Sequence, residues 1–214
     1  MKVTEEIANF IVEVKYDDLP QEAVVSAKRH ILDCLGVAIA GITSPIGQIV
    51  VKVNGEATEE GEATVVGTGF STSAPSAAFV NGTLAHAIDI DDSAAGTIAH
   101  PSAPILPALL ALGEKFEVSG KKLLTAYILG IEVFYRVALA SQGLMRGWHR
   151  TSVFGAIAAA AAAAKLMGLN VAQIEAAIGI STSLAAGLQV NFGTMTKSIQ
   201  VGNASRSGSV AALL

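Results

Sequence analysis

The sequence predicts an all-α fold, a multi-helix bundle-like single domain over residues 1–214. Three observations predict it. The chain is 51% hydrophobic with a mean hydropathy of +0.53, yet only 5% aromatic. Its apolar content is mostly Ala with Ile, Val and Leu, which suits closely packed helices. Apolar residues also recur at helical spacing along most of the chain, with short connections between the periodic segments.

In the first half of the chain, the 5–14 segment has Ile7, Ala8, Ile11 and Val14 on one helical face. Leu19-Pro20 then starts a second helix, which runs from 21 to 36 or 41. Helix and strand remain equally open for 46–53, which is rich in β-branched residues. A strand-like run follows at 63–66, and "GTGFST" is a turn, because it lacks the pattern of a phosphate-binding loop. A helix resumes at 73 or 74 and extends toward 86–92.

The second half of the chain is predicted to be helical over 101–116, from Ser119 through "AYILGIEVFYRVALA", through the alanine run to Lys165, and from 170 or 171 to 187. Thr151 or Ser152 is the expected N-cap of the alanine-rich helix. The final "RSGSVAALL" stops within an apolar helical pattern, so we expect a longer parent chain.

Composition and charge exclude several classes of function. The charge-free stretches 63–88 and 176–196 are interrupted by polar residues, so no membrane span is expected. The acidic N-terminal segment does not resemble a signal peptide, and the expected location is the cytoplasm. A single cysteine, Cys34, excludes an internal disulfide and a cysteine zinc site, and is expected to be buried. A net charge of −4 without a basic cluster argues against nucleic acid as a partner.

The stretch "HAIDIDDSAAGTIAHPS" at 86–102 concentrates charge in a chain that is only 15% charged. If 81–92 is helical, His86, Asp89 and Asp92 share a face while Asp91 points elsewhere. Three interpretations stay open: a divalent metal on His86, Asp89, Asp92 and His100, an acid/base site, or an Asp-capped helix end. The acid/base interpretation is favoured because the chain lacks a second acidic helix.

Two further polar segments could carry chemistry. In "RGWHRTS", His149 lies between Arg146 and Arg150 just before a helix, an arrangement that suits a carboxylate substrate. Lys197 is the only charged residue between Glu175 and Arg206. An isolated lysine in apolar surroundings either snorkels or binds an anion.

Six segments, in order, resemble the MmgE/PrpD family of 2-methylcitrate dehydratases, cis-aconitate decarboxylases and iminodisuccinate epimerases. They are "AKRHILDCLGVAIAG", "AAFVNGTLAHAIDIDD", "HPSAPILPALLALGE", "SGKKLLTAYILGIEVFYRVA", "GWHRTSVFGAIAAAAAAAKLMGL" and "MTKSIQVGNASRSGSVAALL". The resemblance covers essentially all 214 residues but only about the first half of a typical member. It implies the family's helical domain without its smaller lid domain.

The resemblance also implies the site residues. The catalytic residues it implies are Asp89, His100 and His149, and the substrate-binding residues are Ser93 and Lys197. The histidine usual three residues after that lysine is Gln200 here. Asp91 and Asp92 are expected to support the turn, and His100 is expected to group with His149 and Lys197 rather than with His86.

The implied activity is metal-independent dehydration of a small di- or tricarboxylate, without a cofactor, by a homodimer-forming lyase of the 2-methylcitrate dehydratase type. Such chemistry needs a base, an acid and cations for the carboxylates, which these residue types provide. Decarboxylation or epimerisation by the same site is an alternative. Another alternative is a catalytically silent helical module, or half of a two-chain enzyme whose partner supplies the lid.

Overall fold

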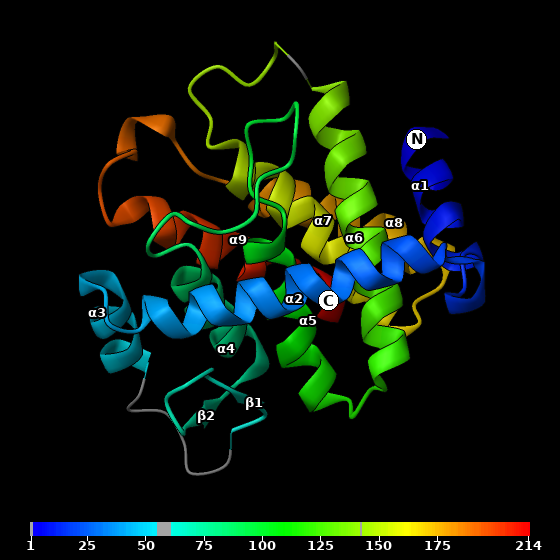
Figure 1. The fold of residues 1–214 in the computed structure, drawn as a ribbon. Coiled ribbons are helices and arrows are strands. Elements are labelled where there is room, and N and C mark those ends of the chain that lie inside the picture. Colours follow the sequence, from blue (N-terminus) through cyan, green and yellow to red (C-terminus); the bar gives the residue numbers. More distant parts are fainter. Residues whose placement is uncertain (1, 55–60, 142) are drawn as a thin grey trace.

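The computed structural model describes residues 2–54, 61–141 and 143–214, and it confirms the all-α class (Figure 1). The helices and strands are α1 (Lys2–Glu13), η1 (Tyr16–Asp18), α2 (Gln21–Gly41), α3 (Pro45–Asn54), β1 (Ala63–Thr64), β2 (Ser71–Thr72), α4 (Ala74–Ala85), α5 (Ser102–Lys115), α6 (Gly120–Ala140), α7 (Arg150–Met167), α8 (Val171–Leu184), η2 (Gln189–Asn191) and α9 (Thr196–Leu213). β1 and β2 form a two-residue antiparallel pair between α3 and α4.

Local signals fixed most helix starts. Ser119 caps α6 by accepting a hydrogen bond from the backbone N–H of Lys122. Asn170 and Gln173 form a reciprocal capping box at the start of α8. The ambiguous 46–53 segment lies within helix α3, which begins at Pro45, a residue favoured in the first turn of a helix.

Three predictions about helix ends are wrong. α8 ends at Leu184 and not at 187. α4 ends at Ala85 rather than continuing toward 92, and Asp89 has a φ of +59°, which no α-helix accommodates. The expected sharing of one helical face within 81–92 is therefore wrong as well. The N-cap of α7 is His149, not Thr151 or Ser152, because the helix begins at Arg150.

Helix α9 lies at the centre of the domain, packed against α4, α5, α7 and α8. Small residues allow the close approach. A Cβ on Gly202 would lie 2.1 Å from Oγ1 of Thr83 and 2.4 Å from the carbonyl oxygen of Phe79, both on α4. A Cβ on Gly208 would lie 2.4 Å from Cβ of Ala159 on α7. The alanine-rich composition thus serves helix contacts too tight for larger side chains.

Helix α2 runs across α4, α5 and α6 and covers this core from one side (Figure 1). Cys34 on α2 is buried, as expected for a small hydrophobic side chain, and burial raises the pKa of its thiol. α2 and the following α3 lie at 87° to each other. The pair therefore forms a corner at the edge of the domain.

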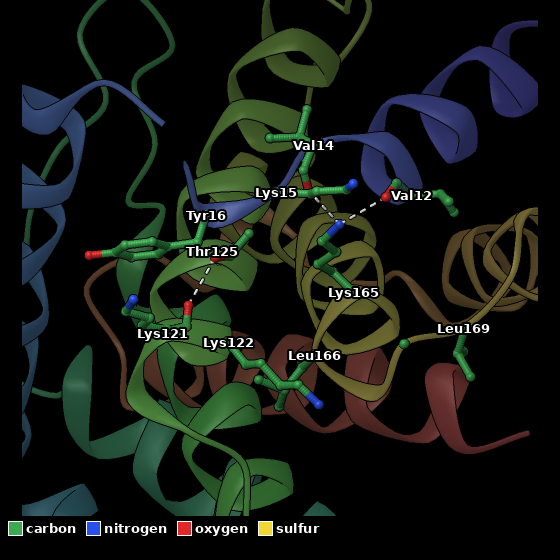
Figure 2. A pocket seen from close by; sticks show the side chains of 11 residues that line it. Val12, Val14, Lys15, Tyr16, Lys121, Lys122, Thr125, Lys165, Leu166 and Leu169 are labelled. Carbon is green, nitrogen blue, oxygen red and sulfur yellow. Dashed lines mark hydrogen bonds between the residues drawn. The ribbon is translucent and has the colours of Figure 1, made fainter. Parts of the chain in front are cut away.

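In the described part of the chain, one helix, α6, has the length and apolar composition of a membrane-crossing helix. It packs against α5 and α7, as the core helix of a globular domain does. Beside α6 lies a pocket of about 360 Å³, shown in Figure 2. There the ammonium group of Lys165 on α7 donates hydrogen bonds to the carbonyls of Ile11 (2.5 Å), Val12 (3.1 Å) and Val14 (2.6 Å), which holds the end of α1 against α7.

Candidate active site

Three of the four histidines of the chain converge at one place. His86 follows the last turn of α4, His100 lies just before α5, and His149 precedes α7. The ring centroid of His86 lies 5.0 Å from that of His100 and 5.8 Å from that of His149. His100 lines one cavity with His149 and Lys197, as predicted, but the His86 ring lies beside it as well, so the expected separation of His100 from His86 is wrong.

Each of these imidazoles is held through Nδ1 by an oxygen atom of the protein. The three contacts are from His86 to both carboxylate oxygens of Asp91 (2.9 and 3.0 Å), from His100 to the carbonyl oxygen of Asp92 (3.0 Å), and from His149 to Oε1 of Gln200 (2.7 Å). Carboxylate, carbonyl and amide oxygens accept hydrogen bonds, so Nδ1 carries the proton in each ring. Nε2 is then the nitrogen left to exchange protons with a ligand.

Burial lowers the pKa of His149 to about 4, although the hydrogen bond to Gln200 opposes that shift. His149 is only 2% exposed, and the charges of its neighbours add to the effect. The ring is thus neutral at pH 7, with Nδ1 donating to Gln200 and Nε2 free to accept a proton. Gln200, which departs from the family pattern, thus holds His149, a contact that the sequence did not predict.

Lys197, at the start of α9, forms an ion pair with Asp89. Partial burial raises the pKa of Asp89, but the hydrogen bond and charge of Lys197 outweigh it, so the pKa lies below its usual value. The Lys197 ammonium also lies 5.3 Å from the ring centroid of Phe192, a cation–π distance. Phe192 in turn packs edge-on against His149, with centroids 4.9 Å apart. The lysine and this histidine are therefore parts of one site.

Two adjacent cavities meet at Lys197. The first, about 300 Å³, is lined by Ile98, His100, His149, Arg150, Thr151, Gln189, Phe192 and Lys197. The second, about 270 Å³, is lined by Ser44, Pro45, Ile46, His86, Ala87, Asp89, Gly193, Thr194, Met195, Lys197 and Ser198. A small anion in either cavity would meet the Lys197 ammonium, and in the first it would also meet two histidines and an arginine.

Behind His100, a buried hydrogen-bond chain fixes the turn. Ser102 donates its hydroxyl to Asp92 (2.5 Å) and its backbone N–H to the same carboxylate (3.1 Å), and the hydroxyl of Tyr127 lies 2.5 Å from that of Ser102. Burial raises the pKa of Asp92. The backbone N–H of His100 also donates to Oγ1 of Thr151 (3.1 Å). This side-chain network agrees with the expectation that Asp92 supports the turn.

The structure brings together four of the five predicted site residues and not the fifth. Asp89, His100, His149 and Lys197 line the two cavities. Ser93 is exposed, and within the described residues it makes no hydrogen bond to the cluster.

His86 and Asp91 belong to the site but were not predicted as site residues. Asp91 is 7% exposed and holds His86, which is a larger role than the turn support that was expected. The spacing of the two was visible in the sequence. In a helix that continued to 92, Asp91 would lie on a different face from His86, so the predicted helix did not bring the two side chains together.

His86, Asp91 and His100 also offer donor atoms within 4.8 Å of one another, the kind of grouping that a divalent ion can use. However, Nδ1 of His86 already donates to both oxygens of Asp91. A metal on Asp91 would compete with that buried hydrogen bond for the carboxylate oxygens. We therefore do not identify the three residues as metal ligands.

Comparison with known proteins gives the family. The sequence profile of the MmgE/PrpD N-terminal domain matches residues 5–214. The chain belongs to the MmgE/PrpD family. Relatives include a cis-aconitate decarboxylase-like protein of Aspergillus oryzae (35% identical over 223 residues), and the cis-aconitate decarboxylases of Homo sapiens (34% over 220) and Aspergillus terreus (33% over 221). Each alignment covers 99% of this chain but only 45–46% of the relative, so the MmgE/PrpD chain spans less than half the length of these proteins.

These relatives of the MmgE/PrpD chain bear the name of a decarboxylase. The expected resemblance to the family as a whole is confirmed. The narrower expectation of 2-methylcitrate dehydration has no specific support among them.

Proposed function

We propose that this chain is the helical domain of a lyase acting on a small di- or tricarboxylate, with cis-aconitate as the first substrate to test. The observation that carries the proposal is the position of the Lys197 ammonium, in one cavity with His100 and His149. A carboxylate bound there would place its neighbouring carbon atoms within reach of both imidazoles. The relatives are named as cis-aconitate decarboxylases or as like them, and this favours cis-aconitate.

Each side chain has a role that its contacts support. Lys197 anchors a substrate carboxylate, and Arg150, which lines the same cavity and donates to the carbonyl of Thr97 (3.3 Å), supplies a second cation. Loss of CO₂ leaves an electron pair on carbon that must receive a proton. For this step His100 is proposed to take a proton from solvent on Nε2 and to deliver it to that carbon, which returns the ring to its neutral form. His149, neutral at pH 7, is proposed to accept a proton from carbon when the reaction is dehydration or epimerisation.

Asp89 and Ser93 complete the proposed set. Asp89 orients the Lys197 ammonium through their ion pair. Ser93 is proposed to hydrogen-bond the substrate, a role that requires the exposed turn at 93 to close over the cavity. No cofactor and no metal are part of this proposal.

Dehydration of 2-methylcitrate is the second candidate reaction, and epimerisation of a related dicarboxylate is the third. Both use the same parts, because each needs a base at the carbon next to a carboxylate and an acid near it. A fourth possibility is that the chain is a silent helical module, or one half of a two-chain enzyme. The products formed from each substrate separate these candidates.

The test uses the purified chain with cis-aconitate and, separately, 2-methylcitrate. Release of CO₂, release of water and inversion are followed by NMR, and binding is measured by calorimetry. We expect Lys197→Met to weaken cis-aconitate binding by at least about tenfold, the loss of one charge-assisted contact. We expect His100→Ala to leave binding intact and to lower turnover by about 10²-fold or more.

Lys122→Met is the matched control, because Lys122 lines the separate pocket of Figure 2. It should bind and turn over cis-aconitate like the wild type. Binding that is equal in the wild type and in Lys197→Met would refute the proposed site. Binding without turnover in the wild type would favour the silent module or the two-chain enzyme.

We also propose a cytoplasmic homodimer. Val25, Leu32 and Ile39 lie seven residues apart on α2 and are 39%, 72% and 53% exposed, so they form an apolar stripe on the outer side of that helix. Such a stripe suits contact with a second helix. Leu32→Glu should convert a dimer to a monomer in sedimentation velocity, whereas a wild-type monomer would refute this part of the proposal.

A further inference from the structure

One atom in the histidine cluster has no partner. Among the buried side-chain nitrogen and oxygen atoms of the described residues, only Nε2 of His86 and Oγ of Ser205 lack a hydrogen bond. His86 is 1% exposed. Leaving a buried polar atom unpaired costs folding free energy, so such an atom needs an explanation.

On the opposite side of the same ring, Nδ1 of His86 faces the buried carboxylate of Asp91. Nδ1 of His86 donates to both oxygens of Asp91, and both side chains are fully buried. A buried carboxylate at this distance stabilises an imidazolium. His86 can therefore hold a second proton, provided that Nε2–H finds an acceptor.

The nearest carboxylate to that nitrogen is the one that now pairs with Lys197. Oδ1 of Asp89 lies 3.8 Å from Nε2 of His86, too far for a hydrogen bond. The Asp89 side chain is 57% exposed, whereas that of Lys197 is 16% exposed. A movement of about 1 Å by Asp89 would bring it to hydrogen-bond distance. Asp89 thus lies between the Lys197 ammonium, with which it pairs, and Nε2 of His86, with which it does not yet form a hydrogen bond.

We propose that His86, held by Asp91, is the receiving partner for Asp89 when a substrate carboxylate takes its place on Lys197. The substrate part of this inference rests on the proposed function. Asp89 then accepts a hydrogen bond from Nε2 of His86, which takes one proton from solvent. Lys197 pairs with the substrate, and the imidazolium pairs with two carboxylates. His86 is a positioning residue, because it acts through Asp89.

The charged groups around His86 favour its protonated form when the substrate is bound to Lys197. The charged and titratable groups that face it in the described chain are Asp89, Asp91, His100, His149 and, beyond Asp89, Lys197. The two neighbouring imidazoles are neutral when Nδ1 alone is protonated. The two carboxylates are then the charges closest to the ring, and they favour its protonated form.

The first experiment needs no ligand. In Lys197→Met, Asp89 loses its ammonium partner, so the ¹⁵N NMR spectrum of His86 should change from the neutral Nδ1–H form to imidazolium at pH 7. The titration midpoint should rise by at least one pH unit, a tenfold gain in proton affinity. The double variant Lys197→Met/Asp89→Asn is the control and should return His86 to the neutral form. A neutral His86 in Lys197→Met overturns the inference, as does an imidazolium in the unliganded wild type.

The second experiment measures the proton taken up on binding. Calorimetry with cis-aconitate in buffers of different ionisation enthalpy should give an uptake close to one proton for the wild type and less than half of that for Asp91→Asn, whose amide stabilises no imidazolium. Asp17→Asn is the matched control, because it makes the same change at an exposed position on η1, away from the histidine cluster, and it should match the wild type.

The two experiments together distinguish failure of this inference from failure of the proposed function. Cis-aconitate binding without proton uptake overturns the inference and leaves the proposed function standing. Absence of binding overturns the proposed function, and the state of His86 in Lys197→Met then decides the inference alone.

Discussion

Acidification between pH 6.5 and 4 should destabilise this domain through His149. The pKa of that ring falls from 6.5 to about 4 on folding, because burial disfavours its charged form. In this range the unfolded chain binds a proton that the folded chain does not, so stability is full above pH 6.5 and declines as the pH falls to 4. At 1.36 kcal/mol per pKa unit, the loss amounts to about 3 kcal/mol.

The assay is urea unfolding of the wild type and His149→Gln at several pH values between 7 and 4. The variant removes the titrating ring, so the difference in unfolding free energy between the two proteins should shrink, by about 3 kcal/mol, as the pH falls. Asp92 acts in the opposite direction. Burial raises its pKa, so it gains its proton more readily in the folded state. That contribution is common to both proteins and cancels.

The outcome that would refute the reasoning is a constant difference between the two curves from pH 7 to pH 4. It would mean that His149 keeps an ordinary pKa in the folded state. Urea m-values that agree between the two proteins would show that the comparison concerns the same unfolding transition.

Two further predictions concern residues of α9. Gln200→Glu places a carboxylate beside Nδ1 of His149, so the pKa of that imidazole should rise by one unit or more in an NMR titration; an unchanged value would contradict the 2.7 Å contact. Gly202→Ala puts a Cβ 2.1 Å from the hydroxyl oxygen of Thr83 on α4, so it should lower the free energy of unfolding, followed by thermal unfolding, by about 1–3 kcal/mol. Gly179→Ala on α8 is the control. No atom lies within 4 Å of its added Cβ, so this variant should raise the free energy of unfolding by about 0.5–1 kcal/mol. Equal melting temperatures for these two glycine variants would show that α4 and α9 are not in close contact.

The helices could be predicted because their signals are local. The 3.6-residue spacing of apolar side chains, the proline at position 20 and the caps at Ser119 and Asn170 act within one or two turns. The ends that failed depended on tertiary contacts. α4 ends at Ala85 as the chain leaves the helix for the His86–Asp91 turn, and this end lies against the start of α9, where Ser198 donates to the carbonyl of His86 (3.0 Å).

By itself, the sequence determined the all-α class, most of the helices and the candidates Asp89, His100, His149 and Lys197. Only the tertiary structure decided which of them meet. Lys197 lies 108 residues from Asp89 in the sequence and forms an ion pair with it. Residues so far apart meet only where α4 and α9 cross, and that crossing depends on glycine contacts that no local pattern encodes. The same crossing buries His86 and leaves its Nε2 without a partner.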